Sequence, residues 1–178
     1  MGTEQRTGQT AAEPVPAGRP TTMKAIVQDV YGEADVLRLE DIDRPKPGAD
    51  EVLLRVHAAG VDRGVWHIMT GLPYPIRLVG YGLRVPKVRV RGREVAGRVE
   101  AVGTNVTTLK PGEDAYGIAE GSFAEYAVGR ADKLALKPTN LNFAQAAATT
   151  ISALTALQAV RDGGQVASGQ TVLIIGAS

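Results

Sequence analysis

Glycine and proline interrupt this chain at short intervals, and they limit its fold more than any other feature of the sequence. The 178 residues include 21 glycines and 10 prolines. Between these breaks lie short apolar segments, and in segment 51–59 Val52, Leu54 and Val56 have the two-residue spacing of one strand face. The pattern favours many short β-strands joined by turns over a bundle of helices.

Further strands are predicted in six segments of the same kind. They are residues 23–30, 36–41, 92–103, 115–118, 122–128 and 133–137. Gly97 lies inside one of them, where a glycine predicts a bulge or a close approach of two backbones. Residues 60–71 are predicted to form a loop with a short helical turn. His57, on the polar face of segment 51–59, is interpreted as a solvated strand residue rather than a ligand.

The pattern changes at Asn142, where a helix is predicted to begin. Asn142 and Gln145 have the spacing of a capping box, and residues 143–161 are rich in alanine, with an interruption expected near Thr149 and Thr150. After the helix, residues 171–175 form a continuous apolar run, which suits a central parallel strand covered on both faces. Because such a strand needs neighbours, we expect it to open a second domain whose remainder is absent from the sequence.

The composition excludes several classes of site. The chain has no cysteine and only two histidines, which rules out disulfides, cysteine-based zinc sites and a zinc site built on three histidines. Twenty basic residues balance 19 acidic ones, so no global field favours nucleic acid or an anionic membrane. Arg89 and Arg91, in the basic stretch 77–98, alternate with Val88 and Val90 and are interpreted as a solvated strand face.

Targeting signals are also missing from the sequence. Residues 1–22 have no apolar core of signal-peptide length, and their composition predicts a disordered tail. No stretch resembles a membrane helix, so the expected location is cytoplasmic, with no membrane and no nucleic acid as partner.

Eight segments in succession resemble one enzyme family. They are MKAIVQDVYG, PGADEVLLRVHAAGVD, GREVAGRVEAVGTNV, LKPGEDAYG, GSFAEYAV, ALKPTNLNFAQAAA, LTALQAV and GQTVLIIGAS. Together they are similar to the medium-chain dehydrogenase/reductase superfamily, and most similar to its zinc-free quinone oxidoreductase branch, which includes NAD(P)-dependent alcohol dehydrogenase homologues.

The resemblance implies a mainly β fold with a terminal helix. Residues 23–142 would form a GroES-like catalytic domain, and residues 143–178 the connecting helices and first strand of a truncated Rossmann α/β domain. In such enzymes NADPH or NADH binds in the cleft between the two domains. The full-length parent would transfer hydride to a small carbonyl or quinone-type acceptor without a metal, and could be a homo-oligomer.

The same resemblance implies a set of site residues. Asp62 and His67 would act in catalysis, with His67 relaying a proton, and Thr155 and Gly176 would contact the cofactor. Trp66 and Tyr74 would line the substrate side. For each of these residues a structural role is the alternative: His67 solvated or structural, Trp66 in the core, and the Thr155 hydroxyl bonded back along its helix.

Two positions distinguish the chain from zinc-dependent relatives. Where those relatives have a metal-binding Cys and a Gly-His-Glu, this chain has Asp62 and the sequence Gly92-Arg93-Glu94. A permanently charged arginine cannot bind a metal ion. We therefore expect no metal, and an ion pair between Asp62 and Arg93 where the metal would lie.

Two other functions remain open at this point. The chain could be a stand-alone GroES-like module that acts through protein contacts, or a fragment of a zinc alcohol dehydrogenase. In the preferred interpretation, the 178 residues alone are expected to show negligible reductase activity, because most of the cofactor-binding domain is absent.

Overall fold

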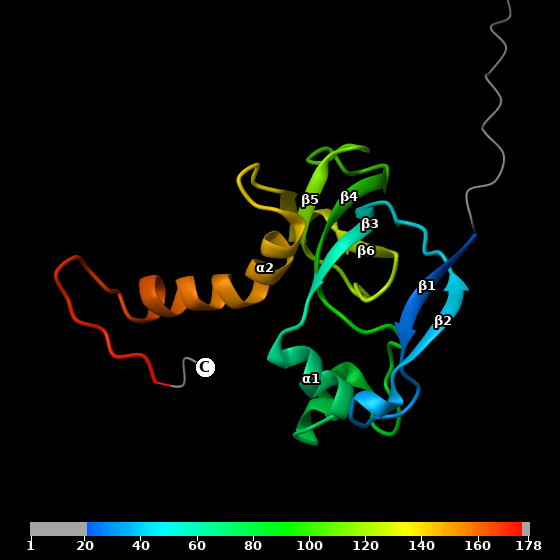
Figure 1. Ribbon diagram of the computed structural model, residues 1–178, viewed down its shortest axis with the longest axis horizontal. Coiled ribbons are helices and arrows are strands. Elements are labelled where there is room, and N and C mark those ends of the chain that lie inside the picture. Colours follow the sequence, from blue (N-terminus) through cyan, green and yellow to red (C-terminus); the bar gives the residue numbers. More distant parts are fainter. Residues whose placement is uncertain (1–20, 176–178) are drawn as a thin grey trace, which may run out of the picture.

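Two antiparallel β-sheets carry most of the regular structure in the computed structural model, which describes residues 21–175 (Figure 1). The smaller sheet pairs β1 (Thr22–Val27) with β2 (Arg38–Asp43). The larger one has the order β6-β3-β4-β5-β7. Its strands are β3 (Glu51–Gly60), β4 (Glu94–Val102), β5 (Asp114–Ile118), β6 (Tyr126–Arg130) and β7 (Leu134–Leu136). The predicted mainly β fold with a terminal helix is confirmed.

The main core lies on the larger sheet and on the loops that cover it. Its buried side chains are Val52, Leu54, Val95, Val99, Leu109, Ala115, Ala119 and Ala127. The prediction that Val52 and Leu54 face the interior is therefore correct. His57 is exposed, as predicted, and its ring stacks on that of Phe143 with the centroids 4.3 Å apart.

The glycine inside β4 marks a close approach of two strands, as its position predicted. A Cβ atom on Gly97 would lie 2.2 Å from the carbonyl oxygen of Arg55 in β3. In the same place the register between the two strands shifts, between Val56 and Ala58. The irregularity bends the pair locally, and only a residue without a side chain fits there.

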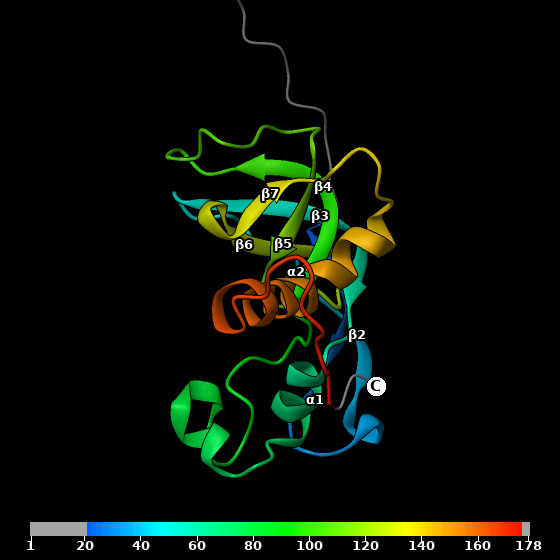
Figure 2. The ribbon, with the colours of Figure 1, turned by 90° about the vertical axis from the view of Figure 1, so that its left-hand side faces the viewer.

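Helix α1 (Arg63–Thr70) follows β3 directly and is longer than the single turn expected from the sequence. It lies beyond the end of the larger sheet, as both views show (Figures 1 and 2). Three further short turns are present in the described part of the chain. They are η1 (Ala34–Val36), η2 (Arg77–Tyr81) and η3 (Ala131–Lys133).

Helix α2 (Phe143–Leu157) begins at the predicted residue and continues as the wider turn η4 (Gln158–Gly163). The side chain of Asn142 accepts a hydrogen bond from the Gln145 amide at 2.8 Å. The side chain of Gln145 accepts one from the Asn142 amide at 3.0 Å, which completes the capping box. The helix is continuous over its length, so the interruption expected near Thr149 and Thr150 does not form.

Replacing Asn142 by alanine should lower the free energy of unfolding by about 1 kcal/mol, because the Gln145 amide loses its side-chain acceptor. Urea unfolding followed by circular dichroism measures this loss. Asn105, which bonds a surface carboxylate of Asp50, provides a control, and Asn105→Ala should cost clearly less. Equal losses in the two variants would contradict a specific role for the cap.

The strand predicted at residues 171–175 does not form. These residues lie in irregular backbone, and Leu173 and Ile175 are 84% and 87% exposed. A parallel strand is stable only beside other strands, and no described segment pairs with this one. Figure 1 shows the end of α2 and the segment after it projecting away from the sheet.

The segment Phe143–Gly163 is long and apolar enough to cross a membrane on length and composition alone. It has 21 residues and a mean hydropathy of 1.2, whereas no such segment was expected from the sequence. This observation is weak evidence for a membrane, because helices of soluble proteins also meet the two criteria. Ala146 and Ala147, in its first turns, are buried against the sheet.

Candidate functional site at helix α1

Helix α1 is fixed at both ends by local hydrogen bonds. Asp62 is its N-cap, and Oδ1 accepts from the Val65 amide at 3.0 Å. Gly71 ends the helix in the left-handed conformation, with φ at 66°, which glycine adopts without strain. The helix buries Val65 and Ile68, while Trp66 and His67 remain half-buried.

The hydrogen bond of His67 determines which of its ring nitrogens is free to react. Nδ1 lies 2.7 Å from the carbonyl oxygen of Leu72. A carbonyl oxygen only accepts, so Nδ1 carries the hydrogen in this contact. Nε2 then has a free lone pair when the ring is neutral, and it is the atom through which His67 could take up or release a proton.

The two predicted substrate residues are held by cation–π contacts. The Arg63 guanidinium lies 4.0 Å from the centroid of the Trp66 ring, and the His67 ring meets Trp66 edge-on at 5.1 Å. Tyr74 is 69% exposed and has Arg77 above its ring at 4.9 Å. Trp66 and His67 are thus brought together, whereas Tyr74 lies at the solvent-facing side.

The expected ion pair between Asp62 and Arg93 is absent from the described part of the chain, so that hypothesis is wrong. Asp62 uses Oδ1 to cap its own helix, and its Oδ2 is buried without a hydrogen-bond partner. The partner of the Asp62 carboxylate is the Val65 amide, three residues along the chain, and this hydrogen bond holds the carboxylate at the start of α1.

Glu94 is a buried carboxyl group close enough to Asp62 to be affected by its charge, and the sequence did not indicate it as a site residue. Its side chain is 1% exposed, and Oε1 accepts from the Ile151 amide of α2 at 2.5 Å. Burial raises the pKa of Glu94, and the negative charge of Asp62 raises it further, against the opposing effect of the α2 amides. The available signal was the position of Glu94 at the start of β4, next to the buried residues Val95 and Ala96.

Of the two predicted cofactor residues, Thr155 and Gly176, the structure describes only Thr155. The Thr155 hydroxyl donates to the carbonyl oxygen of Ile151 at 2.7 Å, in an exposed part of α2, which is the structural alternative given above. Gly176 lies outside the described residues. Within residues 21–175, no three or more His, Asp or Glu side chains are grouped so that they could hold a metal ion.

Comparisons with known proteins agree on one family. Residues 48–139, about half of the chain, match the alcohol dehydrogenase GroES-like domain. Quinone oxidoreductase from Mus musculus is 33% identical over 159 residues, which cover 88% of this chain and 46% of that enzyme. The chain therefore spans about half the length of the curated relatives it matches.

Solved structures show the same relation. The quinone oxidoreductase from Coxiella burnetii superposes with a TM-score of 0.74 at 28% identity, over 83% of this chain and 47% of that one. The Escherichia coli quinone oxidoreductase complexed with NADPH gives a TM-score of 0.68 at 26% identity, over 79% and 41%. The chain belongs to the alcohol dehydrogenase GroES-like domain family and corresponds to the N-terminal half of enzymes in the quinone oxidoreductase branch of the medium-chain dehydrogenase/reductase superfamily.

Proposed function

We propose that residues 23–142 form the catalytic half of an NADPH-dependent oxidoreductase that reduces small carbonyl or quinone-type acceptors without a metal ion. The observation that carries this proposal is the fold shared with the Escherichia coli enzyme complexed with NADPH. Quinone oxidoreductases among the relatives support the same class of acceptor. Arg93 supports chemistry without a metal, because it stands where zinc-dependent relatives have the histidine of Gly-His-Glu and its guanidinium repels cations.

Three residues of α1 fit such a role. NADPH, when bound, supplies the hydride. The buried, unpartnered Oδ2 of Asp62 fits a hydrogen-bond donor of the cofactor, such as an amide or a hydroxyl group. Trp66 provides an apolar wall that excludes water, and Nε2 of His67 can deliver a proton to the reduced acceptor.

The proposal is tested by measuring NADPH consumption with menadione as acceptor, in protein expressed from the complete reading frame and in the 178-residue chain. We expect saturable activity in the first and negligible activity in the second, because the second lacks most of a nucleotide-binding domain. Absence of activity toward quinones and small enones in the complete protein would refute the proposal.

Metal removal separates this chemistry from that of zinc-dependent relatives. Dialysis of the complete protein against a chelator should leave the rate of NADPH consumption unchanged within twofold. Loss of the rate on dialysis, with recovery when zinc is added, would show that the proposed metal-free mechanism is wrong.

His67 is tested in the same assay. His67→Phe keeps the ring contact with Trp66 but removes the proton carried by the imidazole, so we expect a tenfold or greater fall in kcat. A solvent-exposed histidine offers the matched control, and His57→Phe should leave kcat unchanged. Equal rates for His67→Phe and the unaltered protein would leave His67 with a structural role only.

The alternative of a protein-interaction module is favoured by one observation. Leu154, Leu157, Leu173 and Ile175 are all about half exposed or more, and apolar residues on a helix and the segment after it commonly contact another domain or protein. Light scattering distinguishes the two proposals. A monodisperse chain that unfolds cooperatively would favour the interaction module, whereas association would favour a missing second domain.

A further inference from the structure

Arg91 is a buried cation whose nitrogens lack partners. The residue is 4% exposed, and its Nε and Nη2 have no hydrogen-bond partner among the described residues. The alternation with valines predicts that Arg91, like Arg89, belongs to a solvated face, and for Arg91 this prediction is wrong. The backbone of Arg91 is bonded on both sides: its amide donates to Ile26 at 3.3 Å, and its carbonyl oxygen accepts from the Phe123 amide at 2.9 Å.

The neighbouring Arg89 shows what Arg91 lacks. Arg89 is exposed, and its Nε donates to Asp29 at 2.6 Å. With Arg38, it holds the pKa of Asp29 at about 2. Burial instead lowers the pKa of Arg91, and Glu120 opposes this only from a distance, without an ion pair. Burying a guanidinium without an anion costs free energy of folding, so an anion that binds Arg91 would stabilise the folded chain.

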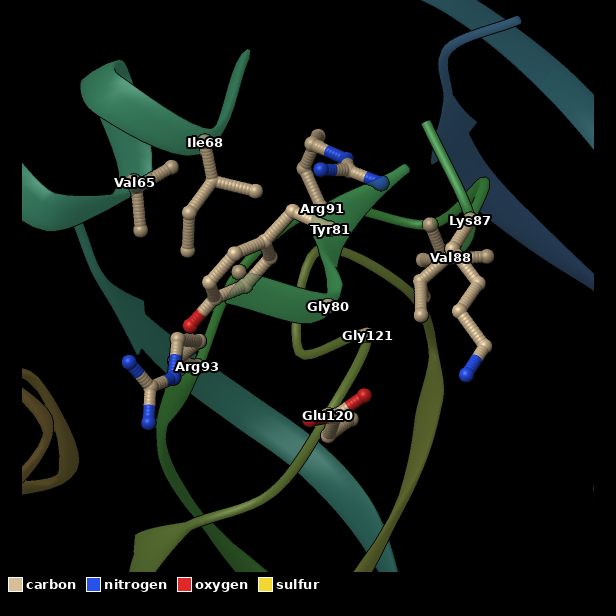
Figure 3. A pocket seen from close by; sticks show the side chains of 12 residues that line it. Val65, Ile68, Gly80, Tyr81, Lys87, Val88, Arg91, Arg93, Glu120 and Gly121 are labelled. Atoms are coloured by element: carbon tan, nitrogen blue, oxygen red, sulfur yellow. The ribbon is translucent and has the colours of Figure 1, made fainter. Parts of the chain in front are cut away.

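Arg91 lines a pocket of about 280 Å³ between α1 and the loop that precedes β4 (Figure 3). Arg93 and Lys87 add two further positive charges to the walls, and Glu120 is the one acidic residue among those that line it. Apolar side chains complete the enclosure: Val65, Ile68, Val88 and Val90. In Figure 3, Arg91 and Ile68 lie in the upper part of the view, and Glu120 lies in the lower part, on the far side of the pocket.

We propose that this pocket is a binding site for a small organic carboxylate, held by the guanidinium of Arg91. Nε and Nη2 are closed to solvent in this structure, so the guanidinium would turn toward the pocket and present two N–H groups to the carboxylate in the bidentate geometry that arginine offers. The apolar body of the carboxylate would contact the valine and isoleucine walls. Glu120 repels an anion and so fixes the carboxylate at the Arg91 end.

The walls favour an organic carboxylate over inorganic phosphate. A phosphate ion would satisfy Arg91, but it would leave the four apolar side chains of the pocket without a contact. A ring the size of benzene, with one carboxylate, uses both kinds of surface. The site lies on the buried side of α1, formed by Val65 and Ile68, and its occupancy does not depend on hydride transfer.

Sodium benzoate is the probe for this site, titrated into the 178-residue chain at constant ionic strength. Isothermal titration calorimetry follows the binding, because Trp66, the chain's single tryptophan, does not line the pocket. We expect saturable binding of benzoate, with benzamide, which has the same shape and no charge, binding at least tenfold more weakly. Phosphate should also bind at least tenfold more weakly than benzoate.

Two variants complete the test. Arg91→Met should weaken benzoate binding at least tenfold, whereas Arg84→Met, at an exposed arginine outside the pocket, should leave it unchanged. Without ligand, Arg91→Met should also raise the unfolding temperature, because an apolar side chain replaces a buried unpaired charge. The comparison of benzoate with benzamide needs no variant and holds even if Arg91→Met fails to fold.

Several results would overturn the proposal. They are equal binding of benzoate and benzamide, phosphate binding as tightly as benzoate, and unchanged benzoate binding in Arg91→Met. None of these results depends on whether the complete protein consumes NADPH, so failure of the carboxylate site and failure of the proposed function remain distinguishable.

Discussion

Replacing Gly97 by alanine is expected to destabilise the chain by more than about 3 kcal/mol, at the upper end of the usual range for overpacked sites. The new methyl carbon would lie 2.2 Å from the carbonyl oxygen of Arg55 and 3.2 Å from Cα of Val56. These neighbours are backbone atoms of β3, which cannot rotate away as a side chain could. Relief requires β3 and β4 to separate, and this pair lies at the centre of the larger sheet.

Urea unfolding measures the effect, and Gly163→Ala provides the matched control. A methyl group on Gly163 would meet its nearest neighbour, the carbonyl oxygen of Gln158, at 3.7 Å, an ordinary van der Waals distance. We expect that variant to change the free energy of unfolding by less than about 1 kcal/mol. Because single domains are stable by about 5–15 kcal/mol, Gly97→Ala should remove a large share of the total. Similar unfolding midpoints for the two variants would contradict the close approach of the strands.

Features that depend on neighbours in the sequence could be predicted. The capping box at Asn142 and Gln145 needs residues three positions apart, and it forms as predicted. Gly97 was recognised because a glycine is unusual in the middle of an alternating strand. The GroES-like domain also follows from the family resemblance, which the match of residues 48–139 confirms.

Features that depend on distant partners could not be predicted in this way. Residues 171–175 have the composition of a buried strand, but a strand forms only when other strands pair with it. The alternation of Arg89 and Arg91 with valines indicated two solvated arginines. Arg91 is instead buried, and its backbone bonds to Ile26 and Phe123 show that the segments around it are far apart in the sequence.

The candidate site also combines contacts between sequence neighbours with contacts between distant residues. Asp62 caps α1 through the Val65 amide, three residues along the chain, and its expected ion pair with Arg93 is wrong. The contact between Glu94 and Ile151 spans 57 positions. No local pattern in the sequence indicates such a pairing, although an acidic residue beside the buried part of β4 was a signal that could have been followed.

Glu94 leads to the second prediction with a large effect. Replacing Glu94 by leucine removes the acceptor of the Ile151 amide, and an amide that loses its partner in a half-buried position costs about 1–3 kcal/mol. The same change removes the hydrogen bond that links β4 to the middle of α2, whereas the packing of Ala96 against Ala146 and Ala147 remains. We therefore expect Glu94→Leu to lower the free energy of unfolding by about this amount at pH 5. At this pH the carboxyl group of Glu94 is less ionised than at neutral pH, so its burial destabilises the unaltered chain least. Equal stability of Glu94→Leu and the unaltered chain at that pH would show that the hydrogen bond contributes nothing.

Glu94→Gln separates the charge from the hydrogen bond, because the glutamine side-chain oxygen can still accept from Ile151. Burial raises the pKa of Glu94 above its usual 4.5, so between 4.5 and the raised value the folded state binds more protons than the unfolded state. The free energy of unfolding contributed by Glu94 therefore increases as the pH falls through this window and decreases as the pH rises. Relative to Glu94→Gln, the unaltered chain should be least stable at pH 8 and should gain stability toward pH 5.

Chemical unfolding at several pH values between 5 and 8 measures this difference. The exposed carboxylates whose pKa is lowered, such as Asp29 and Asp132, lose their stabilising effect only below about pH 4, so their window does not overlap with that of Glu94. Glu33→Gln, at an exposed position, is the matched control and should follow the unaltered chain at every pH. If the difference between the unaltered chain and Glu94→Gln is constant from pH 5 to pH 8, Glu94 does not titrate in this window, and its charge is compensated inside the fold by the α2 amides and Arg93.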